Sequence, residues 1–309
     1  MAKQKTIVRG RLGKRVISQW QLYILLLPAF FMLILFHYVP MYGVTIAFKD
    51  LGIGEDMLGG TWVGFKHFER LFKSPNFPVI LGNTLKITLT EIILTTPLAI
   101  FFALMVHNSS SRRIRKISQT LSYMPHLLAT VVVVTIIELV CRPEVGLINI
   151  VIEKLGMEPV DILGDEKAFL PLYLISDIWQ HLGSNAVVYI AALSAVDTQL
   201  VEAATLDGAN KMQRMWHVDI PTIMPTFIML TIMKFGQVLN VGYEKVLLLQ
   251  NDLNIGASEI ISTYVYKQGI VSAQYSYSAA VSLFNNLVGV ILVIIVNKLA
   301  KKFADMSLF

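Results

Sequence analysis

The sequence predicts an all-α polytopic membrane protein with six transmembrane helices. Of its 309 residues, 55% are hydrophobic and only 15% are charged, and the mean hydropathy is +0.61. A soluble domain is typically about 45–50% apolar and about 25% charged. The apolar residues also gather in runs of about 20 residues, the length that a helix needs to cross a bilayer. This composition excludes a soluble enzyme, a disordered chain and a collagen-like chain.

Six apolar runs define the predicted spans. In chain order they are Trp20–Val39, Asn83–Val106, Ile117–Val140, Leu170–Leu193, Ile220–Val241 and Ala279–Asn297. The first run is predicted to be a retained helix rather than a cleaved signal peptide, because aromatic residues lie at both ends and a small-residue cleavage site is lacking. The chain therefore divides into a basic tail at 1–19, a membrane domain at 20–297 and a second tail at 298–309.

The distribution of Lys and Arg predicts the orientation. Basic residues gather in both tails and in the second and fourth connections, whereas the third connection is net acidic. The positive-inside rule then places both termini in the cytoplasm. The pI near 9.1 follows from these clusters, so nucleic acid is not an expected partner. Lys86 and Lys234 fall near the ends of predicted spans, where each is expected to extend toward the membrane surface, and a buried functional charge is the alternative.

Catalytic and metal-binding patterns are not found in the sequence. The single Cys141 excludes an internal disulfide and a multi-cysteine metal site. The six histidines are scattered singly, and Gly-Lys occurs only at Gly13-Lys14, where Arg15 follows instead of Ser or Thr. The phosphate-binding loop of an ATPase is therefore lacking. The chain is predicted not to be an enzyme, and to bind no metal or cofactor.

The fourth connection, residues 194–219, predicts a short helix that lies parallel to the membrane surface. Asp197 can cap its N-terminus. Small residues such as Ala203 and Ala204 would let a partner protein approach closely, and Gly208 would end the helix. Pro221 suits the first turn of the helix that follows, where its missing N–H is harmless.

The same connection resembles the EAA loop of ATP-binding-cassette importer permeases. Glu202-Ala203-Ala204 is followed after three residues by Gly208, and after nine more by Val218-Asp219-Ile220-Pro221. The family pattern has E-A-A, three residues, G, nine residues and I-x-L-P. Val218 and Ile220 depart mildly from it, and Thr198 stands where many sugar permeases have Pro.

Flanking segments are similar to the carbohydrate-importer permeases of the maltose or multiple-sugar type, LplB-like subgroup, over roughly residues 20–300. The segments that carry this similarity include Phe36-His37-Tyr38-Val39-Pro40, Trp62-Val63-Gly64-Phe65, Ser122-Tyr123-Met124-Pro125-His126 and Ser176-Asp177-Ile178-Trp179-Gln180. The resemblance implies a type I ABC importer permease fold in a bacterial plasma membrane. It also implies import of oligosaccharides or complex glycans.

The resemblance further implies that the loop helix is a coupling helix that docks on an ATPase subunit. The residues expected to carry this coupling are Glu202, Ala203, Ala204, Asp207, Gly208, Lys211, Arg214 and Pro221. For Lys211 and Arg214, lipid phosphate or solvent is an alternative partner. The implied assembly contains a second homologous permease, two copies of a cytoplasmic ATPase that bind ATP and Mg²⁺, and an extracellular solute-binding lipoprotein.

A sugar path requires hydrogen-bonding groups and flat aromatic faces. The candidates within the spans are Trp179, Gln180, Asn185, Tyr189, Gln237, Asn240, Tyr243, Asn285 and Asn286, together with Glu138 and Asp177. Hydrogen bonds between helices are the alternative role for these polar residues. In the fifth connection, Asn251-Asp252-Leu253-Asn254 and Tyr264, Tyr266, Tyr275 and Tyr277 could reach the binding protein, or could form an ordinary aromatic belt.

Three alternative functions follow from the same residues. An ABC permease of this architecture could carry phosphate, a peptide or an amino acid instead of a sugar. An ion-driven secondary transporter would show inverted repeats, or broken helices with charges at the middle of the membrane. A membrane-bound enzyme would need a catalytic constellation, which the sequence lacks.

Overall fold

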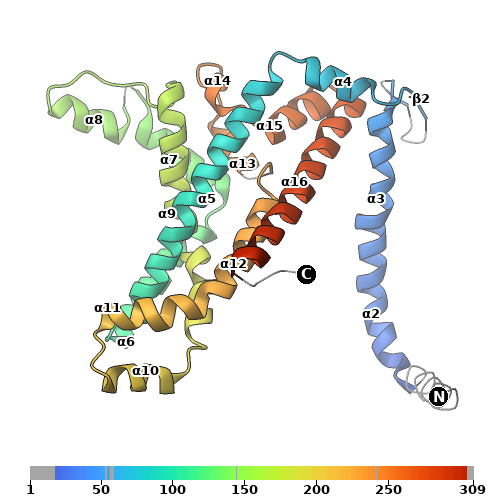
Figure 1. Ribbon diagram of the computed structural model, residues 1–309. Helices are drawn as coiled ribbons and strands as arrows, with labels where there is room; N and C mark the ends of the chain where they lie inside the picture. Colours follow the sequence, from blue (N-terminus) through green and yellow to red (C-terminus); the bar gives the residue numbers. More distant parts are fainter. Residues whose placement is uncertain (1–17, 53, 56–58, 144, 241, 305–309) are drawn as a thin grey trace, which may run out of the picture.

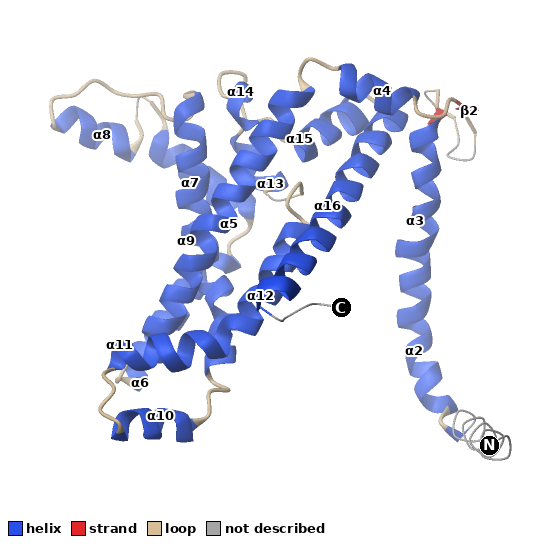
Figure 2. Ribbon diagram, in the orientation of Figure 1, coloured by secondary structure: helices blue, strands red, loops and turns tan. Residues whose placement is uncertain are grey.

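The computed structural model describes residues 18–304 apart from 53, 56–58, 144 and 241. The predictions for the basic residues of the N-terminal tail and for residues 305–309 lie outside these ranges. Within them the chain is predominantly helical (Figures 1 and 2). Strands β1 (Lys49–Asp50) and β2 (Thr61–Trp62) form a small antiparallel hairpin.

Four helical segments among the described residues are long and apolar enough to cross a membrane. They are Trp20–Phe48, Phe77–His107, Lys211–Gly236 and Tyr275–Lys302. Two bent pairs of helices raise the number to six if each pair counts as one span. The predicted all-α membrane architecture is therefore confirmed, and the six predicted spans correspond to these segments with shifted bounds.

The prediction of one continuous helix over Ile117–Val140 is wrong. Helix α6 (Arg112–Tyr123) leads into the 3-10 turn η3 (Met124–Leu127), and α7 (Thr130–Cys141) then departs at 93°. Pro125 at the start of η3 has no N–H to donate, and Leu128 and Ala129 have extended backbone. The apolar composition indicated a span but could not indicate this break.

The fifth predicted span also has different bounds. Helix α12 (Ile220–Gly236) ends before Gln237, five residues short of the predicted end at Val241, a residue outside the described ranges. At the other end the helical run starts at Lys211 with α11 (Lys211–Arg214) and η4 (Met215–Asp219). Pro221 therefore lies inside a continuous run. The π-helical turn η4, in which Ile220 N–H donates to Met215 O, precedes the proline at this point.

The bundle is built around α5 (Phe77–His107) and α9 (Glu166–Leu193), which pack along much of their length (Figure 1). Buried alanines, including Ala99, Ala103 and Ala186, let these two helices approach closely. Helix α16 (Tyr275–Ala304) packs against α12, where a Cβ on Gly289 would lie 2.7 Å from Gly236 O.

The N-terminal helical segment stands apart from this bundle (Figure 1). It comprises α2 (Trp20–Leu33), η1 (Ile34–Tyr38) and α3 (Val39–Met41), none of whose residues is buried. The chain rejoins the bundle through η2 (Tyr42–Phe48), which contacts α16. The apolar surface of this segment therefore faces lipid or another membrane subunit.

The two ends of the bundle differ. In the part of the chain that the structure describes, one end carries α6, α10 (Thr198–Leu206) and α11, which continues into η4. The other end carries the β-hairpin and the short helices α4 (Lys66–Lys73), α8 (Leu147–Lys154), α14 (Ile255–Ser258), α15 (Ile261–Tyr266) and η5 (Lys267–Val271), and α13 (Tyr243–Leu249) lies deeper in the bundle. The ammonium of Lys66, at the start of α4, donates to Asp50 of the hairpin over 2.5 Å and holds the pKa of that carboxyl below its ordinary value.

The α12–α16 contact leads to a test of packing. We expect Gly289→Ala to lower the melting temperature of the detergent-purified protein, because the added methyl group meets the Gly236 carbonyl oxygen and such overpacking costs about 1–3 kcal/mol. The matched control is Gly82→Ala on α5, where nothing lies within 4 Å of the added carbon. An equal melting temperature for both variants would show that the close contact does not form.

Candidate functional site

Helix α10 has the capped geometry that the sequence predicted. At its start, Asp197 Oδ1 accepts a hydrogen bond of 2.9 Å from Gln199 N–H. At its end, Gly208 has φ +83°, a conformation that costs side-chain-bearing residues free energy. Ala209 N–H donates to Ala204 O over 2.9 Å and Gly208 N–H to Thr205 O over 3.1 Å, which is the Schellman pattern. The helix therefore has fixed ends.

The surface of α10 has little contact with the rest of the chain. None of its residues is buried, and the Leu206 side chain is 88% exposed. Helices α9 and α10 form a bend of 77°, so α10 lies across the end of the bundle (Figure 1). Glu202, Ala203 and Asp207 are exposed on it. An exposed leucine beside small residues is a surface suited to a protein partner.

Three side-chain contacts hold the rest of the loop. Arg214 Nη1 donates to Thr205 Oγ1 over 3.0 Å, and Lys211 Nζ donates to Ser110 Oγ over 2.8 Å. The buried Asp219 accepts a hydrogen bond of 2.7 Å from Asn108 Nδ2. Lys211 and Arg214, expected to contact the ATPase or lipid, thus have partners within the chain. The loop is bonded to the connection between α5 and α6.

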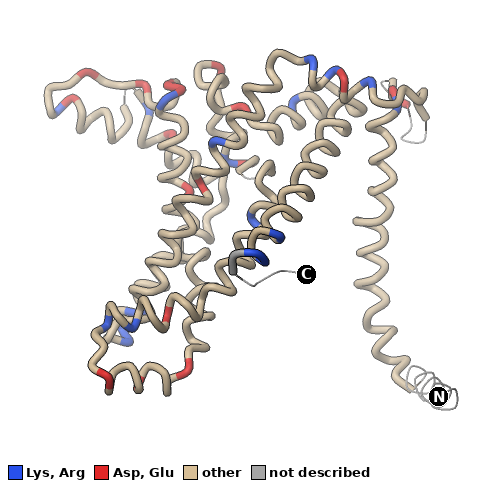
Figure 3. The backbone as a smooth tube through the Cα atoms, viewed as in Figure 1, with Lys and Arg blue, Asp and Glu red and all other residues tan. Residues whose placement is uncertain are grey.

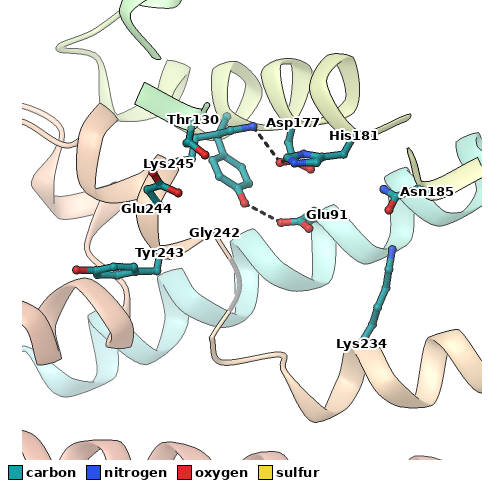
Figure 4. A pocket seen from close by; sticks show the side chains of 11 residues that line it. Glu91, Thr130, Asp177, His181, Asn185, Lys234, Gly242, Tyr243, Glu244 and Lys245 are labelled. Atoms are coloured by element: carbon teal, nitrogen blue, oxygen red, sulfur yellow. Dashed lines mark hydrogen bonds and ion pairs between the residues drawn. The ribbon is translucent and has the colours of Figure 1, made fainter. Parts of the chain in front are cut away.

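A polar cavity of about 490 Å³ lies within the bundle, between α5, α9, α12 and α13. Its lining residues are Glu91, Thr130, Tyr173, Asp177, His181, Asn185, Lys234, Gly242, Tyr243, Glu244 and Lys245 (Figure 4). Gly242 has φ +74°, and a Cβ there would collide with the Tyr173 hydroxyl. Glycine at this position thus lets the chain between α12 and α13 pass close to α9.

Buried charges organise one wall of the cavity. Lys245 Nζ donates to Asp177 Oδ1 over 3.0 Å, and His181 Nδ1 lies 2.9 Å from the same oxygen. The Lys245 and Asp177 side chains are only 4% and 11% exposed. Next to them, Tyr173 donates its hydroxyl hydrogen to Glu91 Oε2 over 2.8 Å (Figure 4). Buried charges need such partners, because an isolated ion loses its hydration without compensation.

Lys234 does not extend toward the membrane surface, so that prediction is wrong. Its ammonium donates to Thr96 Oγ1 over 3.1 Å and to Thr95 Oγ1 over 3.5 Å. Figure 4 shows the side chain extending from α12 toward Asn185 on α9. Lys234 and Asn185 also line a second cavity of about 190 Å³. The two cavities therefore share a polar boundary. The exposed Lys86 lines neither of them.

The structure brings some of the predicted sugar-path residues together and separates others. Asn185, Tyr189, Gln237 and Tyr243 line one or both cavities, as does Asp177. The predicted residues that line neither are Trp179, Gln180, Asn240, Asn285, Asn286 and Glu138. Gln180 Nε2 instead donates to Leu128 O over 3.2 Å, and Asn285 Nδ2 donates to Asn240 Oδ1 over 2.5 Å. These amides form hydrogen bonds between segments.

Sequence reasoning missed Glu91, Tyr173 and Lys245 as cavity residues, and misplaced Lys234. A signal was present for Glu91, which is the one acidic residue in the predicted span Asn83–Val106. A charged residue inside a span commonly faces a cavity or another helix. Lys245 gave no such signal, because it follows the predicted span and looked like an ordinary loop residue. Within the described ranges, no group of three or more metal-type side chains gathers.

Comparison with known proteins identifies the family. Residues 95–304 match the family model described as "Binding-protein-dependent transport system inner membrane component". The chain belongs to this family. Its members are permease subunits of ABC transporters, so this chain is non-catalytic and ATP hydrolysis is carried out by a separate subunit.

Two curated relatives from Bacillus subtilis (strain 168) cover nearly the whole permease. The polygalacturonan/rhamnogalacturonan transport system permease protein YteP is 41% identical over 97% of this chain and 94% of its own length. Protein LplB is 38% identical to this chain, over 94% of this chain and 92% of the length of LplB. Among solved structures, the chain is similar to one described as a bacterial alginate ABC transporter in complex with an alginate pentasaccharide-bound periplasmic protein. It has a TM-score of 0.88 and 31% identity, and it covers 96% of this permease and 100% of that chain.

This match confirms the predicted type I ABC importer permease fold. It also decides against the ion-driven secondary transporter, although the structure does contain broken helices and charges inside the bundle, the features expected of that class. Here those features belong to an ABC permease.

The ion pair in the cavity wall leads to a second test. We expect Lys245→Met to destabilise the permease by about 3–5 kcal/mol, because it leaves the buried Asp177 carboxylate without its ammonium partner. The double variant Lys245→Met with Asp177→Asn removes both charges and should recover most of the melting temperature. Equal losses in the single and double variants would contradict a pairing role.

Proposed function

We propose that this chain is the transmembrane permease of an ATP-driven importer of oligosaccharides or complex glycans. The observation that carries the proposal is a polar cavity inside a fold shared with polysaccharide transporters. YteP is named for polygalacturonan and rhamnogalacturonan, and the structural relative for alginate. The cavity supplies hydroxyl, amide and carboxylate groups together with the ring of Tyr243, which is the mixture that sugar hydroxyls and C–H faces require.

The assembly proposed around this permease has four kinds of component. They are a second homologous permease, two copies of a cytoplasmic ATPase that bind ATP and Mg²⁺, an extracellular solute-binding lipoprotein and the glycan. The unburied α2 supports a membrane partner, because a second subunit would cover its apolar surface. The periplasmic protein bound to the alginate transporter supports the solute-binding component.

The proposed orientation places the α10 end and both termini in the cytoplasm of a bacterial cell. Basic residues of α6 and α11 gather at the α10 end (Figure 3), as the positive-inside rule requires. The opposite end then faces the binding protein. At this end the side chains of Asp252 and Leu253 are exposed and could contact the binding protein. Asn254 and Tyr277 are buried, so they pack inside the permease instead.

In this proposal α10 transmits closure of the two ATPase subunits to the membrane helices. Glu202 would contact the ATPase by hydrogen bonds or charge, and Ala203 and Ala204 would allow a close fit. The capped ends keep α10 rigid, and the Asn108–Asp219 hydrogen bond joins the loop to α5. A displacement of α10 is then passed to the fourth connection, which contains α10, and to the second connection, between α5 and α6. This suits a rigid-body change between inward- and outward-facing states.

Uptake of labelled oligosaccharides tests the proposed function. Cells that lack the gene should lose uptake of an oligosaccharide and keep uptake of labelled peptides and phosphate. Loss of peptide or phosphate uptake with normal oligosaccharide uptake would instead favour the permease for another solute.

A third test concerns α10. We expect Gly208→Pro to abolish uptake while leaving the protein in the membrane, because proline cannot adopt φ +83° and removes the N–H that bonds Thr205 O. Glu202→Lys should also abolish uptake, by reversing a charge in the ATPase contact. The matched control is Gly156→Pro, which changes another glycine of positive φ, +80°, at the opposite end. Normal transport by the Gly208 and Glu202 variants would refute the coupling role of α10.

A further inference from the structure

A mostly apolar groove of about 610 Å³ lies between α6, η3 and α9. Among its lining residues, α6 and η3 supply Thr120, Tyr123, Met124 and Leu127, and α9 supplies Val187 and Ile190. None of these residues lines either polar cavity. Met124, Leu127 and Val187 are exposed, so the groove is an open apolar surface in a membrane domain and needs an apolar cover.

The groove lies within one leaflet of the bilayer. Arg115 Nη2 donates to His107 O over 2.7 Å, which places the start of α6 at the α10 end of the bundle (Figure 1). The other end of α6 lies well inside the bundle, because a Cβ on Gly183 of α9 would collide with the Ser122 backbone. Gly183 is ten residues, or about 15 Å, from the end of α9 at Leu193. That length is half of a hydrocarbon core of about 30 Å.

The side of α6 that lines the groove continues into basic residues. Arg113, Lys116, Thr120 and Tyr123 follow one another at spacings of three or four residues, so they lie along one side of the helix. From the α10 end inward, this side presents two cations, then the polar Gln119 and Thr120, then the apolar groove. A phospholipid has the same order of groups, with an anionic phosphate, glycerol esters and acyl chains.

The cations at the start of α6 lack anionic partners. Arg112, Arg113 and Lys116 are exposed, and none of them has a hydrogen bond or ion pair among the described residues. Arg115 differs, since it donates to the carbonyl oxygens of His107 and Ser109. The first turn of α6 contains no acidic residue, and the positive end of the helix dipole disfavours cations there. An anion from outside the chain would therefore be stabilised at this position.

We propose that this groove binds one anionic phospholipid, with the phosphate on Arg113 and Lys116 and an acyl chain along Met124 and Val187. An apolar helix of another subunit would also fill the groove, but it would leave both cations without an anion. The volume of about 610 Å³ falls within the range of about 300–1,000 Å³ typical of small-ligand sites. This site is separate from the cargo path, and the proposed orientation of the permease assigns it to the cytoplasmic leaflet.

The test uses the complete transporter, with its second permease and its ATPase subunits, in detergent. Native mass spectrometry measures the affinity for phosphatidylglycerol and for phosphatidylcholine with identical acyl chains, so only the headgroup charge differs. A phosphatidylglycerol with a photoreactive group in one acyl chain is then crosslinked to the transporter. Peptide mapping of the labelled protein locates the chain. We expect tighter binding of phosphatidylglycerol, and labelling of α6, η3 and α9 at the groove.

Charge removal tests the headgroup contact. The double variant Arg113→Gln with Lys116→Gln should weaken phosphatidylglycerol binding by about tenfold or more, because each Lys or Arg near an anionic lipid contributes roughly fivefold. Phosphatidylcholine binding should change by less than about twofold. The matched control is Lys298→Gln with Lys301→Gln, which removes two exposed lysines near the end of α16, outside the groove. The control should change neither affinity.

Filling the groove tests the acyl-chain contact. Val187→Trp should abolish labelling at the groove, because the indole occupies the space of the chain. The matched control is Ile175→Trp, at another exposed position of α9 that does not line the groove, and it should keep the labelling.

Four results would overturn the lipid site. They are equal wild-type affinity for the two lipids, a loss in the Arg113 and Lys116 variant no larger than in its control, undiminished labelling in Val187→Trp, and labelling confined to other surfaces. The last result would show that protein covers the groove. None of them bears on carbohydrate import, which is tested by uptake, because the groove shares no lining residue with the polar cavities.

Discussion

The structure depends on one constraint, which is that backbone groups inside a membrane must find partners within the protein. Helices satisfy this constraint over most of the described residues, and two of the breaks between helices, the one at Leu128 and the one at Leu239, find their partners in polar side chains. At the first break, Gln180 donates to the Leu128 carbonyl oxygen. At the second, Ser262 Oγ and Asn285 Nδ2 both donate to the carbonyl oxygen of Leu239. Polar side chains within the bundle therefore make the breaks possible.

The breaks in turn create the cavity. The segment after α12 leaves the helical path at Gln237 and returns as α13, which brings Lys245 against Asp177. A continuous helix through this region would carry Lys245 away from α9. The same break leaves Gln237 and Tyr243 on the cavity lining. Irregular backbone at this depth is tolerated because it is packed in protein and lines a polar space.

The local features of the loop could be predicted from sequence, because they depend on neighbouring residues. The Asp197 cap and the Gly208 turn each need only a few residues of context, and both are present in the structure. The cavity could not be predicted in this way. In the sequence, Asn185 and Gln180 are both polar residues within one predicted span. Their different roles depend on the position of the Leu128 carbonyl, which accepts a hydrogen bond from Gln180, whereas Asn185 lines the cavity.

The helix that is proposed to meet the ATPase contributes no residue to either cavity. Substitutions at cavity positions such as Lys234 therefore leave the exposed surface of α10 chemically unchanged. Under the proposed function, cargo preference and attachment to the energy-supplying subunit can evolve separately. Duplicated copies of such a gene could diverge toward new nutrients while all of them continue to share a single ATPase.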